Sequence, residues 1–280
     1  MEFAYDLARD MTKSGYPTYA DGIKTKEDFI LEAERAFSSE DEEILLFEEA
    51  GRVLGWIHYY HLREARYLGT RAFCVKSGMK DALAEFIAFA RARFPGSDLY
   101  LGFPRENTEA VAALEALGFS RIEESCNNVL CFDDYTLQPE NTTIIPITRE
   151  NYGLFSDLHS RYEEEMYWTS ARILSAMDRW KIYVYLQGGK AAGAVYWTKD
   201  ALLSEIFGVD LLKDDVEGDI CRALLTAALN EEKRSGAKFK VFFCEERFQR
   251  DALACGFRCV GGYVCYKTEL VGGNPDLAIR

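Results

Sequence analysis

The sequence predicts an α/β protein made of two tandem domains of one kind, each with a mixed, mostly antiparallel, twisted sheet and helices on both faces. Length supports two domains, because 280 residues approach the size at which a single hydrophobic core stops growing. Repetition supports two copies of one domain. A strand–turn–strand pattern around Gly55 returns around Gly193, and a helix-ending glycine at Gly118 returns at Gly256, so both spacings (193 − 55 and 256 − 118) equal 138 residues.

Composition and charge narrow the class of protein. Apolar residues make up 48% and charged residues 28% of the chain, as in a folded globular protein. The formal net charge of −13 argues against a nucleic-acid partner, because a duplex binder needs a basic surface to displace counterions. No apolar run approaches the roughly 18 residues of a membrane span, and residues 1–6 carry no basic segment ahead of an apolar one. We therefore expect a cytoplasmic protein that does not bind membranes, with its oligomeric state left open.

Cysteine and histidine content gives no support for a metal site. None of the eight cysteines forms a CxxC pair, and the three histidines form no HExxH motif. Several cysteines lie inside apolar runs such as 72–75 and 241–244. This pattern is typical of buried, reduced thiols in a cytoplasmic chain.

Two helical stretches come first in each half. In the first half, Thr25 through Asp28 predict a capping box at the start of the second helix. A strand, a glycine-containing turn and another strand follow over 44–58 and again over 183–196. The apolar segments 67–75 and 201–209 then predict a third strand.

The third strand leads into an amphipathic helix in each half. A short strand follows at 98–103 and 238–244, and then a helix that ends at Gly118 or Gly256, where glycine suits a left-handed C-cap. Each half is expected to close with a β-hairpin. The apolar positions at helical spacing in the amphipathic helices are Met79, Leu83, Phe86, Ile87 and Ala90, and then Ile220, Ala223, Leu224, Ala227 and Ala228.

The domain boundary is expected in the polar, proline-containing segment 138–143. We expect a first domain over 1–137, a linker and opening strand over 138–146, a second domain over 147–270 and a loose tail over 271–280. Residues 143–147 offer an opening strand for the second half, whereas residues 1–6 offer none for the first. Strand exchange between the halves therefore stays open.

The segment Asn107 to Phe119 resembles the late motif of the GCN5-related N-acetyltransferase (GNAT) family, which has an asparagine, an alanine three residues on, and Gly-Phe closing the helix. The expected order of elements is similar to that of the same family, once per half and over nearly the whole chain. The resemblance implies a tandem acyl-CoA-dependent N-acyltransferase. Acetyl-CoA or another acyl-CoA would be the co-substrate, and the acceptor would be the primary amine of a small, possibly cationic, molecule.

The resemblance also implies a coenzyme site where the central helix of the first half begins. A helix N-terminus binds a diphosphate through its unpaired amides and its partial positive charge. The loop keeps one glycine of the family pattern Arg/Gln-x-x-Gly-x-Gly/Ala, and its flanks, residues 71–80, carry three basic residues and no acid. A solvated basic loop is the alternative interpretation. The residues implied are Val75, Lys76, Ser77, Gly78, Met79 and Lys80, together with Asn107 of the late motif.

The same segment of the second half is acidic, and we expect that this half has lost coenzyme binding. A diphosphate would meet its own sign of charge there, so the acids are expected to cap the helix and complement its dipole instead. Lys213 is the one basic residue among them. The acids are Asp210, Asp214, Asp215, Glu217 and Asp219.

Catalytic candidates favour the second half. Glu205 lies on the strand before the central helix, where the resemblance places the general base, while Arg71 stands there in the first half. A solvated edge residue is the alternative for Glu205. The family's late-motif tyrosine, which protonates the leaving thiolate, would fall at Leu114 and Ala252. Tyr100, Tyr263 and Tyr266 are the possible substitutes, and packing aromatics are the alternative for each.

Other candidates have ordinary structural interpretations. The stretch 162–168 combines carboxylates with aromatic rings, which would suit a cationic acceptor, but such a run is commonly a charged helix end. His58 and His61 are expected to be structural. Neither half has a complete set of motifs, because Val75, Lys80 and Leu114 depart from the family pattern. The alternative to an enzyme with its coenzyme in the first half is a catalytically inactive GNAT-fold binding or interaction protein.

Overall fold

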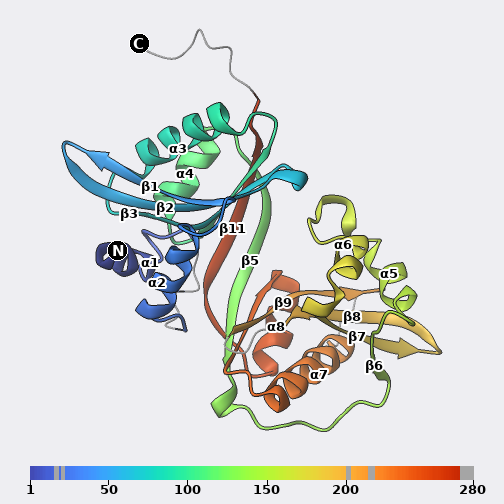
Figure 1. Cartoon of the computed structure of the whole chain (residues 1–280). Coiled ribbons are helices and arrows are strands. Elements are labelled where there is room, and N and C mark those ends of the chain that lie inside the picture. The colour runs from blue at the N-terminus through green and yellow to red at the C-terminus, as the bar shows by residue number, and fades with distance from the viewer. Residues whose placement is uncertain (16–18, 20–22, 200–202, 214–217, 272–280) are drawn as a thin grey trace. The chain divides into compact units, whose positions relative to one another are not determined.

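The computed structural model describes residues 1–15, 19, 23–199, 203–213 and 218–271 (Figure 1). The chain forms two compact units. Unit 1 comprises Met1–Glu124 and the chain from Gly261 onward, and unit 2 comprises Ser125–Val260. Each unit is a mixed α/β sheet with helices on both faces, as the sequence predicts.

Unit 1 has its strands in the order β1-β2-β3-β4-β11. The pairs β1–β2, β2–β3 and β4–β11 are antiparallel, and β3–β4 is parallel. Helices α3 and α4 pack one apolar cluster against the sheet, and α1 and α2 pack another. The elements are α1 (Glu2–Ala8), α2 (Lys26–Arg35), β1 (Glu42–Glu49), β2 (Arg52–Leu62), the short helix η2 (Arg63–Ala65), β3 (Tyr67–Val75), α3 (Met79–Arg93), β4 (Asp98–Pro104), α4 (Thr108–Ala116) and β11 (Arg258–Glu269).

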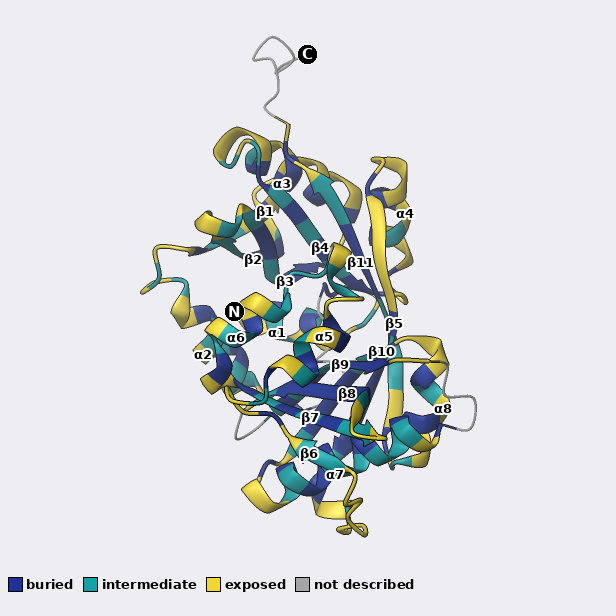
Figure 2. Ribbon diagram, turned by 90° about the vertical axis from the view of Figure 1, so that its right-hand side faces the viewer, coloured by how far each residue is buried: buried dark blue, intermediate teal, exposed yellow. Residues whose placement is uncertain are grey.

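Unit 2 has its strands in the order β5-β10-β9-β8-β7-β6. Helices α7 and α8 cover one face, and α5 and α6 cover the other (Figure 2). Among the paired strands of unit 2 in the described ranges, β9 and β10 are parallel and the other pairs are antiparallel. The elements are β5 (Ser120–Cys131), η3 (Phe132–Asp134), β6 (Ile144–Pro146), α5 (Gly153–His159), η4 (Glu163–Glu165), α6 (Ser170–Ser175), η5 (Met177–Arg179), β7 (Trp180–Gln187), β8 (Lys190–Thr198), β9 (Leu203–Leu211), α7 (Asp219–Ser235), β10 (Phe239–Cys244) and α8 (Glu246–Ala254).

The last strand of each sequence half begins in its own unit and continues into the other unit. Strand β5 pairs with β10 over Cys126–Cys131, and β11 pairs with β4 over Tyr263–Glu269. The expected closing hairpins are therefore wrong, because each is one continuous strand whose main-chain groups are bonded in the opposite sheet. For the same reason the compact units do not follow the boundary expected over 138–146.

Local signals in the sequence are confirmed. Thr25 and Asp28 form the predicted reciprocal capping box at the start of α2. Gly118 and Gly256 end α4 and α8 with φ of 77° and 98°, a backbone conformation that favours glycine.

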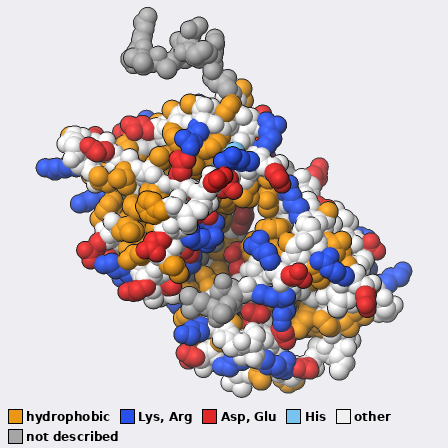
Figure 3. Space-filling view, viewed as in Figure 1, with side chains coloured by type: hydrophobic (Ala, Val, Ile, Leu, Met, Phe, Trp, Pro, Cys, Tyr) orange, Lys and Arg blue, Asp and Glu red, His pale blue; other side chains and the backbone are white. Residues whose placement is uncertain are grey.

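On the face drawn in Figure 3, acidic and basic side chains are interspersed. Within the described ranges, no helix combines the length and apolar character that a membrane crossing requires. In the same ranges, His, Cys, Asp and Glu side chains form no group of three suited to a metal ion.

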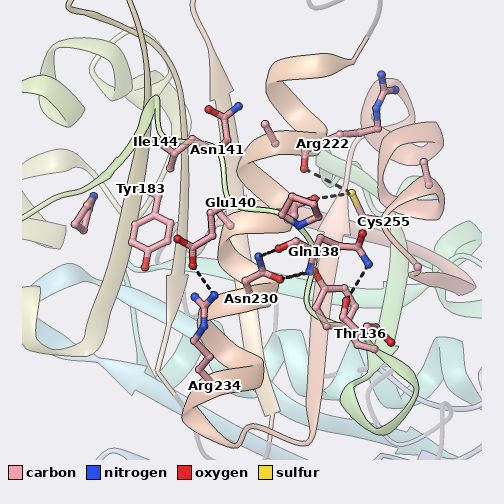
Figure 4. Close-up of a pocket in the computed structure, with 18 of the residues that line it drawn as sticks. Thr136, Gln138, Glu140, Asn141, Ile144, Tyr183, Arg222, Asn230, Arg234 and Cys255 are labelled. Atoms are coloured by element: carbon pink, nitrogen blue, oxygen red, sulfur yellow. Dashed lines mark hydrogen bonds and ion pairs between the residues drawn. The ribbon is translucent and has the colours of Figure 1, made fainter.

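Asn230 of α7 holds the segment that follows β5 (Figure 4). Its side chain is buried, with an exposed fraction of 2%. The Oδ1 atom accepts hydrogen bonds from the Gln138 amide at 3.0 Å and from the Tyr135 hydroxyl at 3.1 Å, and Nδ2 donates to the Gln138 carbonyl at 2.9 Å. One side chain thus satisfies both main-chain groups of Gln138.

Replacing Asn230 with alanine would leave both Gln138 main-chain groups without these partners. We expect the free energy of unfolding to fall by about 3 kcal/mol, measured by chemical denaturation. Gln138→Ala is the matched control, because within the described part of the chain that side chain donates to the exposed Thr136 carbonyl alone. Equal destabilisation by the two variants would contradict this role of Asn230.

Candidate functional site

The residues predicted to hold coenzyme A lie together at the N-terminus of α3. Val75 ends β3, and Met79 begins α3. Gly78 is the N-cap of α3 with φ of 76°, which favours glycine. Asn107 is the N-cap of α4, where its side chain accepts a hydrogen bond from the Ala110 amide.

The parallel strands of unit 1 diverge early. Pairing of β3 with β4 ends at Leu68 and Leu99, and we call the divergence beyond these residues the unit 1 fork. A thioester arm would need main-chain groups that face a fork of this kind. The chain's own residues Lys13–Gly15 occupy this position instead.

Three contacts define this filling of the unit 1 fork. The Val75 amide donates to the Lys13 carbonyl at 3.1 Å. The Asn107 Nδ2 atom donates to the carbonyl of fully buried Ser14 at 3.0 Å. A Cβ on Gly15 would lie 2.9 Å from the Phe73 Cβ, so the segment packs tightly on β3.

The N-terminus of α3 also meets a carboxylate of its own chain. The Met79 amide donates to Glu109 Oε1 at 3.2 Å, and Lys13 Nζ lies 3.9 Å from Glu109 Oε2. The helix amide that a diphosphate would use is therefore bonded. The structure brings the predicted residues 75–80 and Asn107 together, but acetyl-CoA does not fit unit 1 in this arrangement.

Unit 2 has an equivalent divergence. Pairing of β9 with β10 ends at Ile206, and we call the divergence beyond it the unit 2 fork. The Leu212 amide donates a hydrogen bond to the Ala192 carbonyl of β8, and the Lys76 amide donates to the Leu54 carbonyl of β2 in the same way, so the two positions are equivalent. Main-chain groups alternate in direction along a strand. The amide of Val75 therefore points toward the unit 1 fork, and the amide of Leu211 points toward the unit 2 fork.

The Val75 amide is hydrogen-bonded to the segment Lys13–Gly15, whereas in the described residues no such segment is hydrogen-bonded to the Leu211 amide. Within the described residues, no main-chain oxygen outside the strands accepts a hydrogen bond from the Leu211 amide. The Leu211 carbonyl accepts a hydrogen bond from the Tyr162 hydroxyl. In the described chain, the Leu211 amide therefore faces the unit 2 fork without a hydrogen bond to a main-chain oxygen.

Glu205 lies at the start of the unit 2 fork. The register aligns it with Val241 of β10, one residue before the last pair. Its neighbour Ile206 belongs to the core under α7. Side chains alternate between the faces of a strand, so Glu205 lies on the face covered by α5 and α6.

Asn127 of β5 lies on the same face of the sheet as Glu205 of β9, and strand β10 lies between these two strands. It is aligned with Phe243, which shares the face of Val241 and therefore of Glu205. Asn127 is fully buried, and neither its Nδ2 nor its Oδ1 atom has a hydrogen-bond partner in the described structure. A buried amide without partners is costly, so the position of Asn127 needs an explanation beyond packing.

Sequence reasoning missed Asn127. Its neighbour Asn128 looks the same in the sequence, but it exchanges two hydrogen bonds with Gln249 on the opposite face. The available signal was an amide pair followed directly by the apolar end of the strand, residues 129–131.

A buried pair, His159 and Asp210, connects α5 to β9 on the Glu205 face. The His159 Nδ1 atom lies 2.7 Å from Asp210 Oδ2, and its Nε2 atom lies 2.9 Å from the Trp168 carbonyl. A carbonyl only accepts hydrogen bonds, so Nε2 carries a proton. Nδ1 and the Asp210 carboxyl group therefore share one further proton.

This shared proton raises the pKa of His159. Burial is the largest influence and by itself would lower the pKa, but the hydrogen bond and charge of Asp210 more than offset it. The folded state therefore holds a proton that the unfolded state releases above about pH 6.5, the ordinary pKa of histidine.

The pair's contribution to the free energy of unfolding should be complete below pH 6.5 and should decline as the pH rises through the raised pKa of His159. We expect a slope of about 1.4 kcal/mol per pH unit in that window, measured by urea unfolding. Asp210→Asn should remove this slope, because an amide can donate to neutral Nδ1. An unchanged slope in the Asp210→Asn variant would show that the pair does not share the proton.

The tyrosine candidates lie in the other unit. Tyr263 covers Gly102, Tyr100 stacks on Tyr67 with ring centroids 4.2 Å apart, and the Tyr266 hydroxyl donates to Glu115. None of the three is in the unit that holds Glu205.

The remaining sequence candidates have structural contacts. His58 lies 3.0 Å from the Glu42 carboxylate, and His61 lies 3.1 Å from the Ser97 hydroxyl. In the stretch 162–168, Glu163 accepts from the Ser170 amide at the start of α6, and Trp168 packs against Trp180.

The N-terminus of α7 also meets carboxylates. Gly218 is its N-cap, and a Cβ there would lie 2.1 Å from Asp251 Oδ1. Arg222 donates to Asp251 at 2.8 Å and to Asp219 at 2.9 Å. The acids predicted at 214, 215 and 217 lie outside the described residues.

A cavity of about 830 Å³ in unit 2 lies on the α7 side of the sheet (Figure 4). Small side chains of α7, Ala223 and Ala227, line it together with the segment held by Asn230. The Glu140–Arg234 ion pair lies across one side of it. Glu205 and Asn127 are not among its lining residues, so it is separate from the unit 2 fork.

Comparisons with known proteins establish the fold. No family model matches the chain, and no curated protein sequence matches it. A GCN5-related N-acetyltransferase from Sphaerobacter thermophilus is similar in structure, with a TM-score of 0.60 and 16% identity over 91% of this chain and 90% of that one. A tandem GNAT protein from the clavulanic acid biosynthesis pathway, solved without AcCoA, has a TM-score of 0.51 and 13% identity over 98% and 97% of the chains.

A third similar structure is a GCN5-related N-acetyltransferase from Kribbella flavida, with a TM-score of 0.53 and 11% identity over 89% of this chain and 96% of that one. At these identities the likeness concerns the fold alone. The chain has the GNAT fold twice, in tandem, as the late motif and the repeated order of elements predict.

Proposed function

We propose that the protein is an N-acyltransferase that moves an acyl group, in the simplest case acetyl, from a thioester to the primary amine of a small molecule, and that unit 2 holds the reacting centre. The observation that carries this proposal is the place of Glu205, one residue before the unit 2 fork begins. Unit 1 is the weaker choice, because Lys13–Gly15 fill its fork.

The chemistry requires a free amine. Glu205 takes a proton from the acceptor ammonium, and the amine nitrogen then attacks the thioester carbon. The C–N bond forms and the C–S bond breaks. The nitrogen releases its second proton as the amide forms, and the leaving thiolate takes up one proton, so the protons balance. Tyr162, bonded to Leu211 at the unit 2 fork, is positioned to supply that proton. Holding the two substrates together contributes much of the rate.

Asn127 suits the acceptor molecule. Its buried amide offers one carbonyl oxygen and two N–H groups that no protein atom uses in the described structure. Two strand spacings across the sheet and two residues along it separate Asn127 from Glu205, about 12 Å in all. A small amine with a second polar group could span this distance.

The inactive alternative is supported by one observation, the filling of the unit 1 fork by the chain itself. A protein that only binds ligands or partners would need neither fork. It would show no thiol release with any thioester.

Glu205→Gln should lower kcat about 100-fold or more while leaving donor binding unchanged, because the amide cannot take the proton. Thiol release with a panel of primary amines measures turnover, and calorimetry measures donor binding. The double variant Lys76→Glu/Lys80→Glu is the control and should be as active as the native protein, because it changes only the loop of unit 1. Full activity of Glu205→Gln, or loss of activity in the double variant, would contradict the assignment to unit 2.

A further inference from the structure

A buried histidine attaches the segment 160–169, between α5 and α6, to strand β9. His159 is the last residue of α5 and is fully buried. Its Nδ1 atom lies 2.7 Å from Asp210 Oδ2, and its Nε2 atom lies 2.9 Å from the Trp168 carbonyl oxygen. One imidazole ring thus bridges β9 and a main-chain group nine residues further along the chain.

The same segment has a second attachment to β9. The Tyr162 hydroxyl donates a hydrogen bond to the carbonyl of Leu211, the residue next to Asp210. The Tyr162 amide donates to the His159 carbonyl at 2.9 Å, so the main chain at Tyr162 is tied to the histidine. Tyr162 is the proposed proton donor to the leaving thiolate, and its position therefore depends on how firmly this segment is held.

The histidine bridge needs two protons. A carbonyl oxygen and a carboxylate accept hydrogen bonds, whereas a neutral imidazole has a single N–H group. When the shared proton is lost, the ring can donate to Asp210 or to Trp168, but not to both. Asp210 is buried, with an exposed fraction of 4%, and a buried charge without a partner costs more than a buried carbonyl without one. The ring therefore keeps its bond to Asp210, and the Trp168 carbonyl loses its donor.

The groups packed around the pair decide where the proton is lost. Phe155 of α5 stacks on the His159 ring without a charge, and burial keeps the pKa of Tyr196 on β8 well above its ordinary value. Among the described residues, the strongest further charges are those of Glu163 in η4, which favours the shared proton, and Arg247 in α8, which opposes it. Because the pKa of His159 is raised overall, the proton is lost above about pH 6.5.

Unit 1 shows that a buried histidine beside a carboxylate does not by itself hold an extra proton. His58 lies 3.0 Å from the Glu42 carboxylate, but Arg71 donates to the same carboxylate at 2.7 Å. Burial, aided by the charge of Arg71, lowers the pKa of His58. Within the described residues, no lysine or arginine forms an ion pair with Asp210, which is free to bind the protonated ring.

We propose that His159 is a positioning residue for Tyr162, and that the proton it shares with Asp210 holds the segment 160–169 against β9. The role of Tyr162 rests on the proposed function, whereas the attachment of the segment does not. Loss of the proton to solvent leaves the bond from Tyr162 to Leu211 as the remaining attachment to β9, and the segment then opens more often. No covalent bond between heavy atoms changes in this step.

Amide hydrogen exchange of peptides covering 160–169 tests the attachment without any substrate. The native protein and Asp210→Asn are compared at each pH between about 6 and 10, so that the intrinsic pH dependence of exchange cancels. In the variant, the side-chain amide donates to neutral Nδ1, and Nε2 keeps its proton for Trp168. We expect equal exchange near pH 6 and exchange about fivefold or more faster in the native protein above the transition. Equal exchange at every pH would overturn the inference.

Glu163→Gln is a second variant that keeps the pair intact. Its side-chain oxygen can still accept from the Ser170 amide, while the charge that favours the shared proton is removed. The transition should therefore move to lower pH and keep its amplitude. An unmoved transition would contradict the assignment to the pair, even if Asp210→Asn failed to fold. His58→Gln is the control in unit 1, and a transition that moved with it would place the titrating group there instead.

Turnover gives a readout that a merely structural histidine would not move. The ratio of kcat for the native protein to kcat for Asp210→Asn should fall about threefold or more across the same pH window, because Tyr162 is held less often. A constant ratio in a window where exchange of 160–169 changes would overturn the positioning of Tyr162. Absence of thiol release at every pH would refute the proposed function, and the exchange result would still decide whether the shared proton holds the segment.

Discussion

Where two parallel strands diverge, their main-chain N–H and C=O groups lose their partners in the sheet. The need to bond these groups is the constraint on which the rest of this structure depends. Buried N–H and C=O groups need partners, and a strand that leaves its neighbour loses them. Unit 1 supplies the partner from its own chain, as the Lys13 carbonyl bonds to the Val75 amide. Unit 2 leaves the equivalent Leu211 amide without a main-chain partner in the described structure, and the same fold thereby provides one closed and one available position.

The N-termini of the two central helices, by contrast, are alike in charge. An α-helix N-terminus favours an anion, and in both units that anion is a side chain of the protein, Glu109 or Asp251. Such carboxylates stabilise the helices and compete with any phosphate-bearing ligand for the same place. The GNAT fold is thus combined with a protein carboxylate at the N-terminus of each central helix, and the fold by itself does not fix the function.

Much of the fold was predictable because its signals are local. The capping box at Thr25, the helix ends at Gly118 and Gly256, and the late motif from Asn107 each depend on residues close in sequence. The exchange of β5 and β11 was not predictable, because a strand has the same pattern whichever sheet receives it. The bonding of Ser14 to Asn107 and the isolation of the Asn127 amide depend on neighbours far along the chain, which no sequence spacing indicates.

Amide hydrogen exchange with and without a non-transferable pantetheine thioether tests the central claim most directly. If the unit 2 fork binds the arm, peptides covering residues 207–211 gain protection on ligand addition, while those covering 71–75 keep the slow exchange that the bond from Val75 to Lys13 already gives them. Protection that appears only in 71–80, with no change in 207–211, would contradict the account.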